Sequence, residues 1–278
     1  MKFEKIYLKD HFPQLGENGC NAYVDCYIPD TIMEHNLGDK KFPCIVVCPG
    51  GGYGYTSERE GDVIAMQFLP QGYRVFVVKY SVNPHGFPQQ LREVAGAMEL
   101  IHKYAEEWHA DASRVAIIGF SAGGHCAAQY SNRYDCPEVR EMFPESKPVQ
   151  ASILSYPVIT ADPKYTHAGT VNTFVGGHTP VDLEEKGVSC HLVVSDKTPP
   201  TFLWHTAEDE LVAVENSLLY AKALREHKIP FELHIYPFGA HGLSIADDQV
   251  YVEPLNAKAA RAGKWVDDMK SWLKMMGF

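Results

Sequence analysis

The chain has 278 residues, 45% of them hydrophobic and 12% aromatic, which is enough for the core of one large folded domain and excludes a disordered chain. Its formal net charge of −10 argues against nucleic acid and anionic membranes as partners, because affinity for phosphates depends on lysine and arginine. No stretch approaches the roughly 18 apolar residues of a membrane span, and the first residues lack the apolar core of a signal peptide.

The predicted elements begin with two amphipathic strands, at 4–10 and 21–29, which we place at an antiparallel edge. Short apolar runs, typical of strands buried on both faces, follow at 44–48, 74–80, 114–120, 151–157, 201–206 and 231–237. Helical patterns cover 89–108, 214–227 and 255–275. Alternating strands and helices predict one α/β domain over 1–278, with a mostly parallel sheet between two layers of helices.

Residues 158–200 interrupt this alternation, with many Pro, Gly, Thr and Asp residues and few periodic apolar positions. We predict an insertion between two strands, helical around 181–187, that lies over the carboxyl ends of the strands and forms a wall of a pocket. The alternative is a long surface loop without a role.

The seven cysteines are an odd number and contain no C-x-x-C pair. Cys44 and Cys48 share one predicted strand, too far apart along an extended chain to form a disulfide. We therefore expect free, buried thiols and a cytoplasmic location.

Ser121 lies in the segment GFSAG, which matches G-x-S-x-G with a predicted strand before it and a helix after it. In this setting the turn forces the serine into a strained backbone conformation, and small neighbours prevent a collision between strand and helix. The pattern predicts a nucleophile. The alternative is an ordinary serine that caps a helix.

A serine hydroxyl needs a histidine base within hydrogen-bond distance. His241 follows the last predicted strand in FGAHGL, where small neighbours leave room for an imidazole over the sheet. The remaining histidines that we considered are assigned to packing or follow the wrong strand: His85, His125, His205 and His234.

An acid must orient this base, and the segment WHTAEDELV offers three carboxylates after one strand. We favour Asp209, which has the shorter side chain in the middle of the turn, and keep Glu208 and Glu210 as alternatives. The chain order Ser121, Asp209, His241 is typical of the α/β-hydrolase fold.

The loop CPGGGYGY at 48–55 follows the first buried strand, and its glycines allow backbone amides to approach a ligand. We predict that the amides of Gly51, Gly52 and Ala122 form an oxyanion hole. A phosphate-binding loop is the alternative, but neither a following Lys-Ser/Thr nor G-x-G-x-x-G is present.

The chain resembles the esterase and lipase branch of the α/β-hydrolases, and more narrowly the bacterial acetylesterases that act on acetylated sugars and xylan fragments. The resemblance lies in three stretches within residues 49–243, namely 49–82, 119–125 and 198–243. The resemblance implies the same nucleophile, acid, base and oxyanion glycines as above. It also implies a small acyl group, acetyl, on a carbohydrate. The wider lipase pattern has histidine before its glycines, but Pro49 stands there, so the hydrogen bonds of that histidine must be replaced or absent.

Aromatic side chains near the predicted strand ends would stack on sugar rings, although aromatic residues at such positions are as often part of the core. The candidates for substrate binding are Tyr53, Tyr55, His85, Phe87 and Trp204.

The sequence thus predicts a serine carboxylesterase acting on a small ester, with no metal or organic cofactor, since ligand spacings such as H-E-x-x-H are lacking. A peptidase or amidase of the aminoacyl-peptidase or formamidase type would use the same triad. A third interpretation is a binding protein that keeps the fold without catalysis. Assembly into a homo-oligomer stays open.

Overall fold

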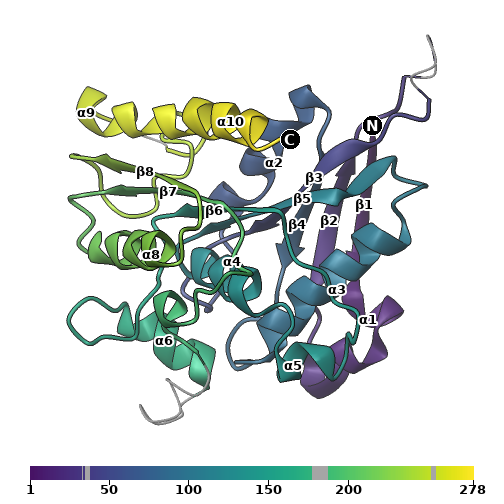
Figure 1. The fold of residues 1–278 in the computed structure, drawn as a ribbon, viewed down its shortest axis with the longest axis horizontal. Helices are drawn as coiled ribbons and strands as arrows, with labels where there is room; N and C mark the ends of the chain where they lie inside the picture. Colours follow the sequence, from purple (N-terminus) through teal and green to yellow (C-terminus); the bar gives the residue numbers. More distant parts are fainter. Residues whose placement is uncertain (33, 35–37, 177–186, 252–254) are drawn as a thin grey trace.

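A computed structural model describes residues 1–32, 34, 38–176, 187–251 and 255–278 (Figure 1). Its strands form one eight-stranded sheet in the order β1-β2-β4-β3-β5-β6-β7-β8. Strand β2 is antiparallel to both of its neighbours, β1 and β4, and β3 to β8 are parallel where they pair. The strands are β1 (Lys2–Tyr7), β2 (Tyr23–Ile28), β3 (Phe42–Cys48), β4 (Arg74–Lys79), β5 (Ala110–Phe120), β6 (Ala151–Ser155), β7 (Thr201–Thr206) and β8 (Phe231–Tyr236). The predicted α/β class and the antiparallel edge are confirmed.

Helices cover both faces of the sheet (Figure 1). One layer holds α3 (Gln89–Lys103), α4 (Ala122–Arg133) and α8 (Glu215–Glu226), and the other holds α2 (Asp62–Phe68) and α10 (Trp265–Met275). Side chains alternate between the two faces of a strand, so neighbouring residues enter different cores. In β3, for example, Val46 packs under the first layer and Ile45 under the second. Both faces are buried, which is why these strands read as continuous apolar runs.

Four further helices, each of eight residues or fewer, lie in the described part of the chain. They are α1 (Leu8–His11), α5 (Pro137–Arg140), α6 (Ala168–Val175) and α9 (Ala257–Ala260), with 3-10 turns η1 (Pro13–Gly19), η3 (Glu58–Glu60), η4 (Leu69–Gln71), η5 (Cys190–Leu192) and η6 (Arg261–Lys264). The first strand begins earlier than predicted, at Lys2, and ends earlier, at Tyr7, because the chain turns at Leu8, which is fully buried and begins α1. The predicted helix 255–275 is divided into α9, η6 and α10.

The insertion 158–200 lies between β6 and β7, as predicted, and contains α6 and η5. The helix predicted at 181–187 falls, except for Gly187, outside the described residues. Two buried side chains of α4 hold the second half of the insertion: His125 Nε2 lies 2.9 Å from the carbonyl oxygen of Val188, and Gln129 Nε2 donates to that of Gly187 at 2.5 Å. The insertion is therefore fixed to the helix that follows Ser121.

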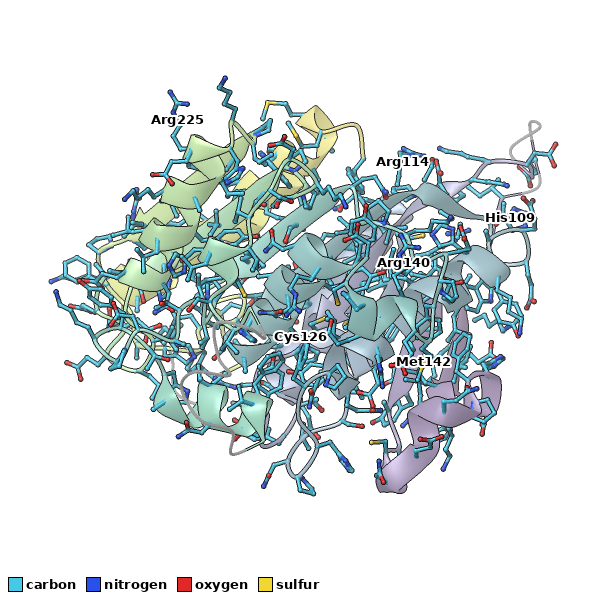
Figure 2. The ribbon with its side chains drawn as sticks, turned by 60° about the horizontal axis from the view of Figure 1, so that its bottom comes forward. His109, Arg114, Cys126, Arg140, Met142 and Arg225 are labelled. Carbon is cyan, nitrogen blue, oxygen red and sulfur yellow. The ribbon has the colours of Figure 1, made fainter. Side chains whose placement is uncertain are left out.

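All seven cysteines are unpaired, and Cys126 lies inside the molecule (Figure 2). Arg225, by contrast, projects from the edge of the molecule in the same view. No helix in the described part of the chain has the length and apolar character needed to cross a membrane.

Candidate active site

Ser121 occupies the sharp turn between β5 and α4, with a positive φ of 53° that only a constrained backbone imposes on a serine. The flanking glycines are a steric necessity. A Cβ at Gly119 would lie 2.2 Å from the carbonyl oxygen of Gly123, and one at Gly123 would lie 2.1 Å from that of Cys48. The G-x-S-x-G pattern therefore reflects the close approach of strand, turn and helix.

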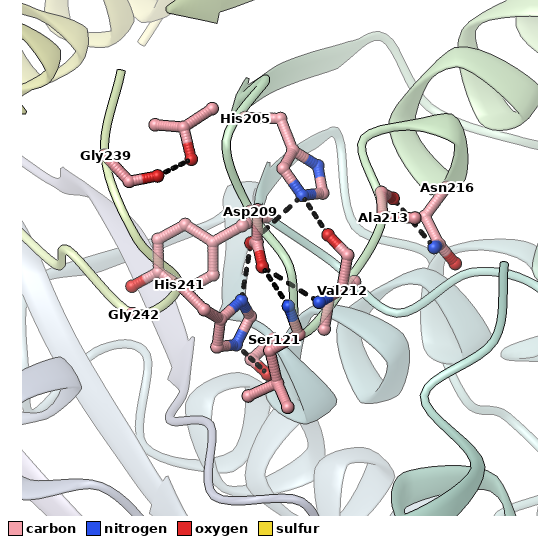
Figure 3. A network of polar contacts seen from close by, with 12 residues as sticks. Ser121, His205, Asp209, Val212, Ala213, Asn216, Gly239, His241 and Gly242 are labelled. Atoms are coloured by element: carbon pink, nitrogen blue, oxygen red, sulfur yellow. Dashed lines mark hydrogen bonds and ion pairs between the residues drawn. The ribbon is translucent and has the colours of Figure 1, made fainter. Parts of the chain in front are cut away.

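The structure brings Ser121, His241 and Asp209 into one hydrogen-bonded chain (Figure 3). His241 Nδ1 lies 2.6 Å from Asp209 Oδ2, and His241 Nε2 lies 2.8 Å from Ser121 Oγ. An ionised carboxylate only accepts hydrogen bonds, so Nδ1 carries the proton in the neutral ring. Nε2 is then free to accept the proton of the serine hydroxyl, as a general base must.

Asp209 is held as a carboxylate by four donors. Its Oδ1 accepts from the backbone N–H of Leu211 at 3.0 Å and of Val212 at 2.9 Å, and its Oδ2 accepts from His241 and lies 3.3 Å from His205 Nε2. Burial by itself would raise the pKa of Asp209, but the hydrogen bonds from His205 and His241 outweigh it and hold this pKa below the ordinary value. Asp209 is thus negatively charged at neutral pH.

The alternative carboxylate Glu208 has a different position: its Oε2 accepts from the backbone N–H of Gly239 at 3.0 Å. It therefore ties the turn after β7 to the loop that carries His241, and it does not contact the imidazole. Glu210, the second alternative, is exposed.

His205 was assigned to packing, and it is fully buried in β7. It also contacts the acid, which the sequence did not reveal. Its Nε2 lies 2.9 Å from the carbonyl oxygen of Val212, which can only accept, so this nitrogen carries a proton and points toward Asp209 as well. Nδ1 accepts from the hydroxyl of Ser217 at 2.8 Å.

The glycine loop after β3 lies beside the nucleophile, since a Cβ on Gly50 would be 3.1 Å from Ser121 Cβ. Gly51 and Gly52 have φ values of +124° and +63°, and a Cβ at Gly51 would lie 2.1 Å from the carbonyl oxygen of Tyr55. Among the hydrogen bonds of the described residues, none uses the backbone N–H of Gly51 or Gly52. Ala122 is the first residue of α4, so its N–H has no partner within the helix. These amides are available to an oxyanion.

Glu60, which the sequence analysis did not single out, connects this loop to the loop of His241. Its Oε2 accepts from the backbone N–H of Gly50 at 2.8 Å, and its Oε1 accepts from the hydroxyl of Tyr156 at 2.6 Å. The Tyr156 oxygen accepts in turn from the backbone N–H of Ser244 at 3.0 Å. The Tyr156 ring also lies edge-on to the imidazole of His241, with centroids 5.0 Å apart.

Glu60 and Tyr80 supply contacts at the place where lipases have a histidine. The Tyr80 hydroxyl donates to the carbonyl oxygen of Pro49, and Glu60 holds the next residue, Gly50. The glycine loop is thus fixed by a buried tyrosine and a buried carboxylate.

A pocket of about 370 Å³ opens over this site. It is lined by Ser121, His241, Gly51 and Gly52 and by the side chains of Tyr55, Arg59, His167 and Leu211. His167 comes from the insertion, which therefore does form part of the wall. Burial, followed by the charge of a protonated His241, lowers the pKa of His167, so its ring is neutral at neutral pH.

Of the aromatic residues proposed for substrate binding, Tyr55 lines this pocket and is 65% exposed. The expectation is wrong for Trp204 and Tyr53, which are fully buried. Trp204 stacks on Trp265 of α10 with centroids 5.1 Å apart, and the Tyr53 hydroxyl lies 2.9 Å from His125 Nδ1.

The other two candidates are not among the residues that line the pocket over Ser121. Phe87 packs on Phe174 with ring centroids 5.5 Å apart, and His85 lines a separate pocket beside Tyr80. Within the described residues, no group of three or more His, Cys, Asp or Glu side chains could hold a metal ion.

Comparison with curated proteins gives two relatives whose names refer to xylan. The chain is 39% identical to endo-1,4-beta-xylanase B of Butyrivibrio fibrisolvens over 235 residues, which are 81% of the chain and 36% of the relative. It is 30% identical to an acetylxylan esterase of Xylanibacter ruminicola over 265 residues, 94% of the chain and 49% of the relative. The chain therefore spans less than half the length of either protein.

Comparison with solved structures gives matches along the whole chain. An acetyl ester-xyloside bifunctional hydrolase from Caldicellulosiruptor lactoaceticus has a TM-score of 0.83 at 34% identity, covering 99% of this chain and 97% of that one. An α/β hydrolase from a deep-sea metagenome library has a TM-score of 0.77 at 28% identity, with 99% and 98% covered. The model of the BD-FAE family matches residues 25–224. The chain belongs to the BD-FAE family and has the α/β-hydrolase fold.

Proposed function

We propose that this protein is a serine carboxylesterase that hydrolyses short-chain esters, acetyl esters of carbohydrates above all, through an acyl-enzyme. The observation that carries the proposal is the chain from Ser121 Oγ through His241 to the Asp209 carboxylate, at 2.8 and 2.6 Å, beside the backbone amides of Gly51 and Gly52, which donate to no acceptor among the described residues. This arrangement contains a nucleophile, a base, an acid and donors for an oxyanion.

In the first half of the reaction, Ser121 Oγ attacks the ester carbonyl carbon while His241 Nε2 takes the hydroxyl proton. The carbonyl oxygen becomes an alkoxide, which accepts hydrogen bonds from the amides of Gly51, Gly52 and Ala122. Asp209, charged and fixed by its backbone donors, stabilises the imidazolium. The tetrahedral intermediate then expels the alcohol, which receives its proton from His241 Nε2, and leaves the acyl group on Ser121.

In the second half, His241 Nε2 takes a proton from a water molecule that attacks the acyl carbon. The same amides hold the second alkoxide, and Ser121 leaves with the proton returned by His241. One carboxylic acid and one alcohol are formed per ester, and no redox step or cofactor takes part.

Two considerations favour a small acyl group on a sugar. The pocket of about 370 Å³ is near the lower end of the roughly 300–1,000 Å³ range of ligand pockets, which suits a small acyl group. Relatives whose names refer to xylan and to acetyl esters support a carbohydrate alcohol.

The test measures turnover of acetyl, butyryl and longer chromogenic esters, acetylated xylo-oligosaccharides and peptide anilides by the wild type and by Ser121→Ala. We expect acetyl esters to be hydrolysed fastest, and Ser121→Ala to reduce kcat about a millionfold, as in other serine hydrolases with a triad. Near-normal turnover by Ser121→Ala would exclude the mechanism. Faster cleavage of anilides than of esters would favour the amidase alternative, and failure of an organophosphonate to label Ser121 would favour a binding protein.

A further inference from the structure

Arg59 lies at the edge of the catalytic pocket, in turn η3, and both ends of the residue are held in place. Its carbonyl oxygen accepts from the hydroxyl of Ser244 at 2.5 Å. Its guanidinium carbon lies 5.3 Å from the centre of the Tyr251 ring, a cation–π contact. Nη2 is 3.5 Å from the point where a Cβ on Gly242 would be. The side chain is exposed, so its charge faces the solvent at the mouth of the pocket.

This guanidinium has no acidic partner in the part of the chain that the structure describes, and besides the ring of Tyr251 it contacts the hydroxyl of that residue. Other arginines in this acidic protein do form ion pairs, such as Arg92 with Glu141 and Arg114 with Asp111. An arginine remains charged at all relevant pH values. Within the described residues, Arg59 therefore presents a positive charge without an ion-pair partner at the mouth of the pocket.

Among the described residues, the other titratable groups around the pocket form no ion pair with this guanidinium. Glu60 also lines the pocket, but it is 4% exposed and its two carboxylate oxygens accept from Gly50 and Tyr156. His167 is neutral because its pKa is lowered, and His241 is paired with Asp209.

The position of the guanidinium indicates which part of the ester it meets. His241 Nε2 delivers a proton to the leaving alcohol, so the alcohol part must pass beside residues 241 and 242. The Arg59 head lies against Gly242. An anionic group on the alcohol part would thus come near a guanidinium whose planar donors bind carboxylates and phosphates in a bidentate manner.

We propose that Arg59 binds an anionic group on the alcohol part of the substrate, so that acetyl esters of acidic sugars are preferred over those of neutral sugars. The inference rests on the proposed esterase function and adds its substrate class. A carboxylate on the sugar, as in a uronate, and a phosphate on the sugar offer the same chemistry to the guanidinium.

The experiment measures kcat and KM for three acetylated methyl glycosides that share one ring and acetyl position: a neutral sugar, its uronate and its phosphate. We expect kcat/KM of the wild type to be about threefold to tenfold higher for an anionic ester than for the neutral one, because KM is lower. This is the size of effect expected of an exposed charge-assisted contact. The ratio between uronate and phosphate identifies which anion fits, and added salt reduces the preference.

In Arg59→Gln the ratio of anionic to neutral ester falls to about one, and Arg59→Lys retains part of it because the charge remains without the planar fork. Arg225→Gln, which removes the same charge from the exposed side of α8, keeps the wild-type ratio. A ratio is the readout because a general loss of activity cancels from it. Equal turnover of neutral and anionic esters by the wild type, or an unchanged ratio in Arg59→Gln, overturns the proposed role of Arg59 and leaves the esterase proposal standing. Absence of turnover of all three esters overturns the esterase proposal with it.

Discussion

The substitution Glu60→Gln tests whether the buried carboxylate positions the oxyanion loop. Both partners of Glu60 are donors: the backbone N–H of Gly50 at 2.8 Å and the hydroxyl of Tyr156 at 2.6 Å. The Tyr156 oxygen already accepts from Ser244, so its own proton must go to Glu60. Glutamine has the same size but one acceptor oxygen and one donor group. One of the two donors must then face an NH2 group.

The expected cost follows from this mismatch. A buried donor without a partner costs about 1–3 kcal/mol, so the free energy of unfolding should fall by this amount. If Gly50 loses its acceptor, the adjacent amides of Gly51 and Gly52 move with the backbone. Complete loss of one oxyanion donor reduces kcat about a hundredfold to a thousandfold. A displaced donor should cost less, so we expect kcat to fall roughly tenfold to a hundredfold with KM changed little.

The assay combines steady-state kinetics on a chromogenic acetyl ester with unfolding in urea. Glu58→Gln is the matched control, since it removes the same charge from an exposed position in the same turn and should leave kcat and stability unchanged. Tyr156→Phe keeps the bond from Gly50 to Glu60 and should therefore retain more activity than Glu60→Gln. Reduced stability of Glu60→Gln with kcat within twofold of the wild type would refute a role in positioning the loop.

Three further changes have expected outcomes. In Asp209→Asn, the N–H groups of Leu211 and Val212 should keep the amide oxygen of the new side chain on their side, so that its NH2 group faces His241 Nδ1. Nδ1 must then accept, and the imidazole proton moves to Nε2, which can no longer act as the base. We expect kcat to fall about ten-thousandfold, as in serine proteases, while the circular dichroism spectrum shows that the fold is kept. Gly123→Ala would place a Cβ 2.1 Å from the Cys48 carbonyl oxygen, and both soluble yield and esterase activity should be lost. Burial raises the pKa of Glu93 from 4.5 to about 7, so the folded state binds more protons than the unfolded state between these values. Its contribution therefore lowers the free energy of unfolding as the pH rises through this window. Between pH 5 and 8, the free energy of unfolding measured in urea should fall less in Glu93→Gln than in the wild type. An equal dependence of this free energy on pH in both proteins would contradict the assignment.

The sequence predicted the elements and the convergence of Ser121, Asp209 and His241 because these depend on local patterns. Continuous apolar runs identify buried strands, and the glycines around Ser121 are required by contacts of 2.1 and 2.2 Å that no other residue can satisfy. The preference for Asp209 over Glu208 also rested on local geometry, the length of a side chain in a turn. In the structure, the backbone N–H groups of Leu211 and Val212 donate to Oδ1 of Asp209 and hold its carboxylate beside His241.

The sequence did not predict the face on which a strand residue lies. Both faces of this sheet are buried, and in the run TFLWHT all six residues are buried and polar residues do not alternate with apolar ones, so no position marks the outside. Trp204 enters the core under α10, while its neighbour Leu203 enters the core under α8. An aromatic residue near the end of such a strand therefore cannot be assigned to the pocket without the register.

Glu60 was missed for a different reason. Its partner Tyr156 is 96 residues away, and a glutamate between an exposed arginine and a glycine looks like a solvated residue. Buried polar contacts of this kind are decided by the tertiary fold, and the sequence signal for them is weak. The departure at Pro49 was the one clue that some other group must hold the glycine loop.

The strand order explains why the insertion reaches the pocket. Ser121 follows β5 and Asp209 follows β7, and β6 lies between these two strands in the sheet. A segment that leaves the carboxyl end of β6 must therefore emerge between the nucleophile and the acid, where His167 is found. Changes in this segment can alter the shape of the pocket while Ser121, His241 and Asp209 keep their places on the neighbouring strands. Arg59 and Glu60, which follow β3, also reach this pocket, but they are bonded to Ser244 and Tyr156 and are therefore linked to the loop that carries His241.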